Sequence, residues 1–167
     1  WEHFFRENDI MHAKSVAECV SGNIATHGHL GDSLQYIVKP SNGSWGNGII
    51  SVTGTEVTSQ KCGPKDEWVA QPRLVDCKAP TVRHFRLVTL HDGTRFSLWE
   101  LTGKKGKVAS NHGQGATVAF CAKGHCNRLS HEENAALESI SVQLSQAHKA
   151  KLALVFSIGW DVMFDCQ

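Results

Sequence analysis

The chain has 167 residues, a length typical of one domain with a core of its own. Hydrophobic residues make up 41% and charged residues 20%, which excludes intrinsic disorder and low-complexity arrays. The 17 Lys and Arg against 16 Asp and Glu leave a formal net charge of +1, so charge does not favour nucleic acid as a partner. No apolar run approaches the roughly 18 residues of a membrane span. We therefore expect a single domain over residues 1–167.

The pattern of apolar and turn residues predicts a β-rich body after an N-terminal segment. Residues 1–34 mix apolar, charged and glycine residues, and we expect them to be irregular or partly helical. The β-rich body is expected over residues 35–166. Its predicted strands are residues 35–39, residues 49–58 with a bulge at Gly54, residues 67–71, 73–77, two paired runs within 82–102, and residues 116–121.

The two runs within 82–102 form the clearest local unit, a β-hairpin. They flank Asp92-Gly93, a dipeptide typical of two-residue hairpin loops. Such a loop places Leu87 opposite Leu98 and Thr89 opposite Phe96. The apolar side chains that then share one face are Phe85, Leu87, Phe96 and Leu98.

A helix is predicted over about residues 131–148. Ser130 and Glu133 match the capping-box pattern S-x-x-E at its start. The apolar residues that recur at helical spacing are Leu137, Ile140, Leu144 and Ala147. One such stripe indicates an amphipathic helix packed on a sheet, and we expect a last strand at residues 152–158.

The cysteines and one sequon indicate an extracellular location. The six cysteines are Cys19, Cys62, Cys77, Cys121, Cys126 and Cys166. An even number in a chain of this size predicts three disulfides and an oxidising compartment. Asn42 begins an N-glycosylation sequon, Asn-Gly-Ser. The chain opens at Trp1 with no signal-peptide pattern, so we expect a mature, secreted chain from which the signal peptide was removed.

Some disulfide pairings are indicated by position. Cys121 follows a strand-like run, and Cys126 comes shortly after a glycine. We therefore expect these two cysteines to form a disulfide that closes a small ring around a turn. Cys166 is expected to attach the C-terminal segment to a distant strand. Its candidate partners are Cys19, Cys62 and Cys77.

The predicted elements follow a simple order along the chain: about eight short strands, one amphipathic helix, a further strand and a terminal cysteine. Over about residues 35–166 this order resembles the lipocalin family. The resemblance implies an up-and-down β-barrel with the helix outside it, and a disulfide from Cys166 to Cys62 or Cys77. The family has a G-x-W motif on its first strand, whereas the G-x-W of this chain, at residues 43–45, lies within a cluster of turn residues and does not match that motif. The expected fold class is thus mainly β, a lipocalin-like barrel or a sandwich, disulfide-bonded and with one C-terminal helix.

Two motifs raise enzymatic or metal-binding alternatives. Residues 31–34 spell Gly-Asp-Ser-Leu, a motif of serine hydrolases, but neither Asp161 nor Asp165 has the late D-x-x-H that those enzymes use, which favours a turn. His27 and His29 form an H-x-H pair that could hold a metal, with further ligands among His12, His112 and His125. A solvated loop is the favoured interpretation of this pair, and we expect no cofactor.

The function that these features favour is a secreted binding protein that holds a small apolar ligand in an internal cavity without catalysis. The side chains expected to line that cavity are Phe85, Leu87, Phe96, Leu98, Phe120 and Phe156. A solid core has the same composition, so the sequence leaves both open. The first alternative is a secreted protein–protein interaction module, such as a pathogen effector or a surface-glycoprotein domain, that uses exposed loops. The second is a hydrolase or metal-dependent enzyme.

Overall fold

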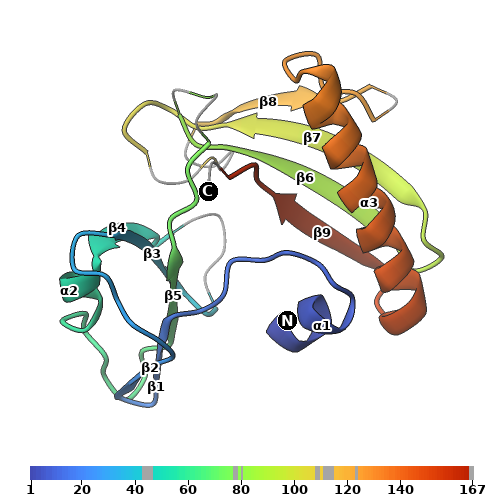
Figure 1. Ribbon diagram of the computed structural model, residues 1–167. Coiled ribbons are helices and arrows are strands. Elements are labelled where there is room, and N and C mark those ends of the chain that lie inside the picture. The colour runs from blue at the N-terminus through green and yellow to red at the C-terminus, as the bar shows by residue number, and fades with distance from the viewer. Residues whose placement is uncertain are drawn as a thin grey trace.

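The computed structural model describes residues 1–42, 47–76, 79, 81–107, 110, 115–122 and 124–165, without the side chain of Glu2. The described residues form two antiparallel sheets, one long helix and two short ones (Figure 1). In chain order the elements are α1 (Glu2–Glu7), β1 (Ala17–Val20), β2 (Asn23–Thr26), β3 (Gln35–Pro40), β4 (Ile50–Thr53), α2 (Gly54–Val57), β5 (Trp68–Pro72), β6 (Arg83–Leu90), β7 (Arg95–Thr102), β8 (Thr117–Phe120), α3 (His131–Lys151) and β9 (Ser157–Val162).

The first sheet contains the strands of the N-terminal half in the order β2-β1-β5-β3-β4. Side chains alternate between the two faces of each strand, so one face of this sheet collects the buried residues. That core consists of Ala17, Cys19, Tyr36, Val38, Val52, Val57, Trp68 and Ala70. Because these side chains are few and several are small, the first sheet encloses a modest core.

The second sheet has the order β8-β7-β6-β9, and α3 covers one of its faces (Figure 1). The predicted apolar stripe of α3 faces the sheet: Leu137, Leu144 and Ala147 are buried and Ile140 is half-buried. The capping box is present, with Ser130 Oγ accepting from the Glu133 N–H at 3.2 Å. The predicted C-terminal helix and its packing on a sheet are therefore confirmed.

The N-terminal segment adds aromatic side chains to the second core. The Phe4 ring stacks on Trp160 of β9 with centroids 5.7 Å apart, and Trp1 meets the same indole edge-on at 5.9 Å. Ile10, just after α1, is buried in the same cluster. The chain thus begins against the second sheet before it enters the first.

The predicted hairpin forms, but its loop differs. Leu87 does lie opposite Leu98, as expected, whereas Thr89 lies opposite Arg95 instead of Phe96. The shift between Val88 and Thr89 makes Phe96 the extra residue of a β-bulge. Phe96 is therefore displaced from the shared apolar face and is 70% exposed.

The turn also differs from the expected one. The Leu90 N–H donates to the Thr94 carbonyl at 2.9 Å, so the loop contains three residues, and Gly93 supplies the positive φ of +87°. A three-residue loop that ends in a left-handed glycine is a common hairpin connection, and the bulge at Phe96 then offsets the additional loop residue. The two-residue loop was wrong, and the bulge explains why the pairing of Leu87 and Leu98 was nevertheless right.

Residues 54–58 are not the second half of a strand with a bulge at Gly54. The chain turns there into α2, where the Thr53 N–H donates to Glu56 Oε2 at 2.7 Å in a second capping box. A Cβ on Gly54 would lie 2.3 Å from the Gly31 carbonyl oxygen, so this glycine permits a close backbone approach.

Three further boundaries differ from the prediction. Residues 23–26 form β2 because Ser21 and Gly22, both at positive φ, close a two-residue hairpin with β1. Residues 73–76 form no strand, and the Asp76 carboxylate instead accepts from Arg83 Nε at 2.7 Å. The last strand begins at residue 157 because α3 continues to residue 151 and a turn follows.

The described strands form two open sheets and no closed barrel. Each sheet ends in strands with one neighbour, β2 and β4 in the first and β8 and β9 in the second. A mainly β fold with a C-terminal helix is confirmed, while the barrel and the lipocalin resemblance are not. No helix of the described residues is both long and apolar enough to cross a membrane.

Two disulfides are present among the described residues. Cys121–Cys126 closes a small ring, as predicted. Cys19 of β1 pairs with Cys62, which excludes both as partners of Cys166. The remaining candidates, Cys77 and Cys166, lie outside the described residues. A disulfide-bonded chain is confirmed for the four cysteines that the structure describes.

Candidate functional site

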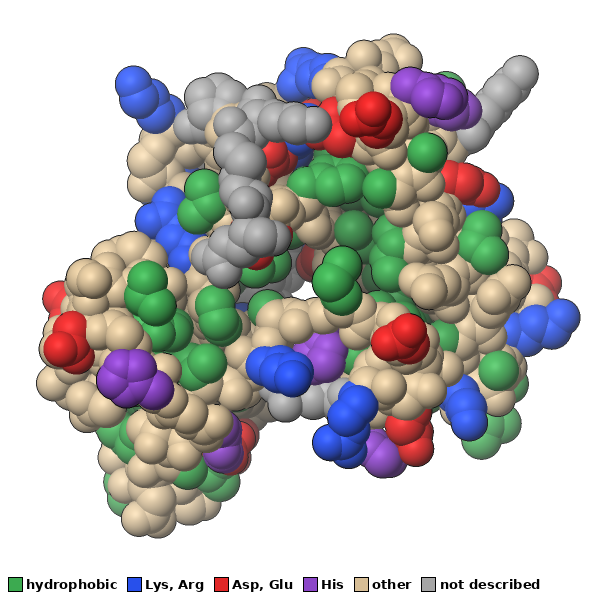
Figure 2. Space-filling model, viewed as in Figure 1, with side chains coloured by type: hydrophobic (Ala, Val, Ile, Leu, Met, Phe, Trp, Pro, Cys, Tyr) green, Lys and Arg blue, Asp and Glu red, His purple; other side chains and the backbone are tan. Residues whose placement is uncertain are grey.

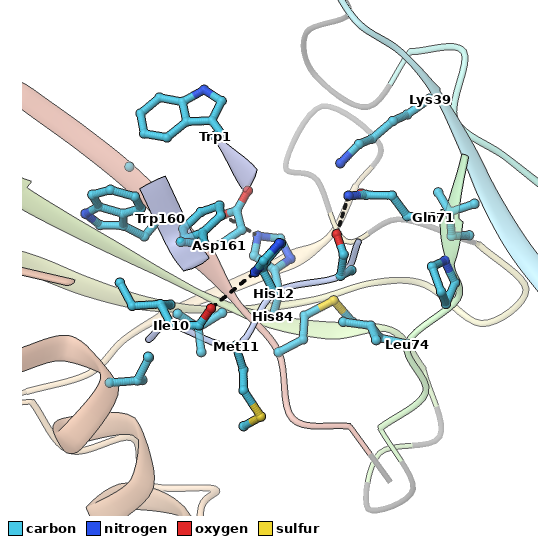
Figure 3. Close-up of a pocket in the computed structure, with 18 of the residues that line it drawn as sticks. Trp1, Ile10, Met11, His12, Lys39, Gln71, Leu74, His84, Trp160 and Asp161 are labelled. Atoms are coloured by element: carbon cyan, nitrogen blue, oxygen red, sulfur yellow. Dashed lines mark hydrogen bonds and ion pairs between the residues drawn. The ribbon is translucent and has the colours of Figure 1, made fainter. Parts of the chain in front are cut away.

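A cavity of about 620 Å³ lies in the cleft between the two sheets. The surface is hollowed there, and hydrophobic side chains gather around the hollow (Figure 2). Its lining includes Ile37, Lys39 and Gln71 from the first sheet, His84, Trp160 and Asp161 from the second, and Ile10, Met11 and His12 from the segment between α1 and β1 (Figure 3). The cleft borders the second core, since Leu144 and Trp160 of that core line it, but the side chains that the sequence placed around a cavity are not among its lining residues.

The alternation of side chains in β3 builds the wall on the first sheet. Tyr36 and Val38 face the first core, so Ile37 and Lys39 face the opposite way, into the cleft. Gln71 of β5 is the cross-strand partner of Ile37 and lies on the same face. Its Nε2 donates to the Ala13 carbonyl at 2.6 Å, which attaches the segment after α1 to this sheet.

Aromatic side chains form the wall on the side of α1. Trp1 and Phe5 line the cavity together with Trp160, and Phe5 also stacks on His12 with centroids 5.1 Å apart. The Trp160 indole N–H is already used, because it donates to Thr89 Oγ1 at 2.7 Å. This part of the cleft therefore offers mainly apolar surface to a ligand.

The wall on the second sheet carries an ion pair. Arg86 holds the Asp161 carboxylate through two hydrogen bonds of 2.7 Å each, from Nε and from a terminal nitrogen. This paired geometry also raises the pKa of the Arg86 guanidinium. The negative charge of Asp161 is thus largely compensated on its own sheet.

His84 is buried beside that ion pair. Its Nδ1 is hydrogen-bonded to Ser110 Oγ, and its Nε2 lies 3.4 Å from Asp161 Oδ1 without forming a hydrogen bond. Burial lowers the pKa of His84; Asp161 opposes this shift and Arg86 adds to it. His84 is therefore neutral near pH 7.

Ser110, His84 and Asp161 are the residue types of a hydrolytic triad, and all three line the cleft. Nucleophilic catalysis needs a serine that substrate can reach and a carboxylate that orients the histidine. Ser110 is only 2% exposed, and Arg86 holds the carboxylate of Asp161. The arrangement fixes the wall of the cleft, and we do not propose hydrolysis.

Lys39 is the polar side chain that distinguishes the cleft. No hydrogen bond or ion pair joins its ammonium group to any residue that the structure describes, and the side chain is half-buried. Burial lowers the pKa of Lys39, and the nearby charge of Asp161 partly opposes that shift. The cleft thus holds an amine that has lost water without gaining a partner.

The six side chains expected to line a cavity do not meet around one. Phe85, Leu87 and Leu98 are buried in the second core beneath α3, while Phe96, Phe120 and Phe156 are exposed. None of the six lines the cleft. The three buried residues therefore belong to a solid core and not to a cavity. The sequence had left both interpretations open.

The other sequence candidates also lie apart. His27 and His29 are exposed, and His27 Nε2 meets Glu18 Oε1 at 3.1 Å. The described part of the chain contains no group of three or more His, Cys, Asp or Glu side chains suited to a metal ion. His12 lines the cleft, His125 is exposed and His112 lies outside the described residues. Ser33 lies exposed in a turn, and the exposed Asn42 donates from Nδ2 to Glu67 at 3.2 Å.

Lys39, His84 and Asp161 line the cleft although no motif in the sequence indicated them as site residues. Alternation within residues 35–39 does separate Ile37 and Lys39 from the apolar pair Tyr36 and Val38. That signal assigns a face but does not identify the sheet opposite it. No model of a known protein family matches the chain, and no curated protein sequence matches it.

Proposed function

We propose that the protein binds a small, largely apolar molecule in the cleft between its two sheets. The observation that carries this proposal is the cavity of about 620 Å³ between the two sheets, which is lined mainly by apolar and aromatic side chains. Small-molecule sites typically measure about 300–1,000 Å³ and combine apolar walls with a few polar groups. This function needs neither a barrel nor a cofactor.

The aromatic wall supports affinity for apolar ligands. Trp1, Phe5 and Trp160 form one contiguous cluster at the cleft, and Trp1 is largely exposed. A ligand that covers such surface gains about 25 cal/mol per Å² of apolar area removed from water. The cluster would therefore supply most of the binding free energy.

The proposed location is extracellular. Two disulfides among the described residues are typical of proteins from oxidising compartments. The exposed side chain of Asn42, at the start of the sequon, is consistent with glycosylation in such a compartment. Secretion and glycosylation are thus part of the proposal.

A fluorescence titration tests the binding function. The probe is N-phenyl-1-naphthylamine, an uncharged apolar fluorophore, and we expect saturable uptake by the wild type at one probe per chain. Ile37→Trp should abolish uptake, because the larger side chain fills the cavity from β3. Val20→Trp is the matched control, since Val20 is exposed at the end of β1 away from the cleft. Absence of saturable uptake by the wild type would overturn the proposal.

A second candidate is the interaction module, and one surface favours it. Trp99 and Phe120 are cross-strand neighbours on the face of the second sheet opposite α3, with ring centroids 4.9 Å apart. With Val118 they leave an exposed apolar patch that could dock a protein. A Trp99→Ser/Phe120→Ser double variant that loses a protein partner captured by the wild type, while still taking up the probe, would support this role.

A further inference from the structure

Resting on the function proposed above, we propose that the ligand is an amphipathic molecule with one anionic head group, a carboxylate, that Lys39 binds. In Figure 3 Lys39 extends from β3 into the cleft, with Trp1 and Trp160 on the far side. A ligand between them would place its charged end at the ammonium group and its apolar part on the aromatic cluster. The cleft would then select a class of ligand by charge as well as by shape.

The charges that line the cleft leave an excess of positive charge. Lys39 and Arg73 both line it, and neither side chain has a hydrogen bond or ion pair to a described residue. Among the described residues, the carboxylate in the lining is that of Asp161, and Arg86 compensates it through two hydrogen bonds. The histidines that the described lining contains are His12, whose Nδ1 lies 3.2 Å from the Ile10 carbonyl, and the buried His84. A bound anion would be balanced by this set, whereas a bound cation would be repelled.

Lys39 provides a specific reason for an anionic partner. A partly dehydrated ammonium group without a hydrogen-bond acceptor destabilises the charged form, and the direction of its pKa shift agrees with that. A carboxylate at Nζ restores the lost interactions through charge-assisted hydrogen bonds, which are about twice as strong as neutral ones. Asp161 does not fulfil this role, because it forms no ion pair with Lys39.

Isothermal titration calorimetry with two matched ligands tests the head group. The ligands are dodecanoate and dodecanol, which share an apolar chain of the same length and differ in charge. We expect dodecanoate to bind the wild type at one per chain and more tightly than dodecanol. Lys39→Met should weaken dodecanoate by at least about tenfold and leave dodecanol unchanged. Lys65→Met, at an exposed lysine outside the cleft, is the matched control and should change neither.

The outcomes separate this inference from the proposed function. If both ligands bind the wild type equally, or Lys39→Met weakens both alike, the head-group inference is wrong while the binding function stands. If neither ligand nor the uncharged probe binds, the binding function itself is wrong. Lys39→Arg keeps the charge and should keep the preference for dodecanoate, which guards against a loss that comes only from misfolding.

Discussion

The two sheets of this protein are stabilised in different ways. The first sheet packs a small core and carries a disulfide, Cys19–Cys62, that joins positions 43 residues apart. The second sheet lies under a 21-residue helix and a larger apolar cluster, and its disulfide joins positions only five residues apart. A small core supplies little net stability, and a disulfide that closes a long loop restricts the unfolded chain more than one that closes a short loop. The covalent link therefore contributes more to the first sheet than to the second.

The second core also contains a fully paired polar network. His148 is completely buried, and its Nε2 lies 2.8 Å from the Val155 carbonyl, which can only accept. Nδ1 therefore accepts from the Thr89 hydroxyl at 2.8 Å, and that hydroxyl accepts from the Trp160 indole. The network connects α3, β6 and β9. The arrangement of these three elements is therefore stabilised by hydrogen bonds as well as by apolar packing.

The largest expected effect is the removal of the long disulfide. A Cys19→Ala/Cys62→Ala double variant should lose about 4 kcal/mol in the free energy of unfolding, since the link closes a 43-residue loop. Urea denaturation measures this loss, and amide hydrogen exchange should locate it in β1 and β5. The matched control, Cys121→Ala/Cys126→Ala, should lose about 2 kcal/mol because its loop is short. Equal losses from the two double variants would contradict the contrast between the sheets.

The second sheet should respond most to a defect under its helix. Leu144→Ala leaves a cavity between α3 and the sheet and should reduce the free energy of unfolding by about 3 kcal/mol. Hydrogen exchange should then increase in β6 and β9 before it increases in β3. Leu154→Ala is the control, because Leu154 is fully exposed and its truncation should be nearly neutral. A neutral Leu144→Ala would mean that α3 is not docked as described.

The polar network of Thr89, His148 and Trp160 should contribute less to the free energy of unfolding than the packing of α3 on the second sheet. Thr89→Val preserves the shape of the side chain but leaves the Trp160 N–H and His148 Nδ1 without hydrogen-bond partners. We expect this change to reduce the free energy of unfolding by about 2 kcal/mol. Thr89→Ser keeps the hydroxyl and should restore most of that stability. Thermal unfolding of the two variants measures the difference. If Thr89→Ser were as unstable as Thr89→Val, packing of the methyl group and not the hydrogen bonds would be responsible.

Local signals in the sequence predicted the second sheet better than the first. The capping box at Ser130 and the stripe that contains Leu144 place α3 without reference to any distant residue. One error arose where a distant contact decides the local structure. Gly54 was interpreted as a bulge because its close approach to Gly31 depends on a segment 23 positions earlier. Ser21-Gly22 did carry a local turn signal, and both residues at positive φ form the hairpin that was overlooked.

The cleft could not be predicted from the sequence for a physical reason. Its residues are distributed over β3, β6 and β9, and only the docking of the two sheets brings them together. An apolar residue such as Phe85 fits a core or a cavity equally well by composition, and here it belongs to a core. The sequence does contain a lysine, Lys39, within an apolar strand. This position indicates a binding site only when the residues of the opposite wall of the cleft are known.

The smallest expected effect is a pH dependence confined to the second sheet. Burial is the main reason why the folded-state pKa of His84 lies below its ordinary value of 6.5. As pH falls through about 6.5, the unfolded chain therefore gains a proton that the folded chain does not, and stability decreases until the lowered pKa is reached. Glu56 in the first half has a lowered pKa too, because it accepts hydrogen bonds from Thr53. The stability that this lowered pKa contributes is fully present above the ordinary value of 4.5, so it does not change between pH 7.5 and 5.5.

Urea denaturation of the wild type and of His84→Gln, which cannot titrate, measures the effect. Between pH 7.5 and 5.5 the urea midpoint of the wild type should fall more than that of His84→Gln, and hydrogen exchange should place the difference in β6 rather than β3. An identical pH dependence for the wild type and His84→Gln would show that this histidine does not distinguish the two sheets.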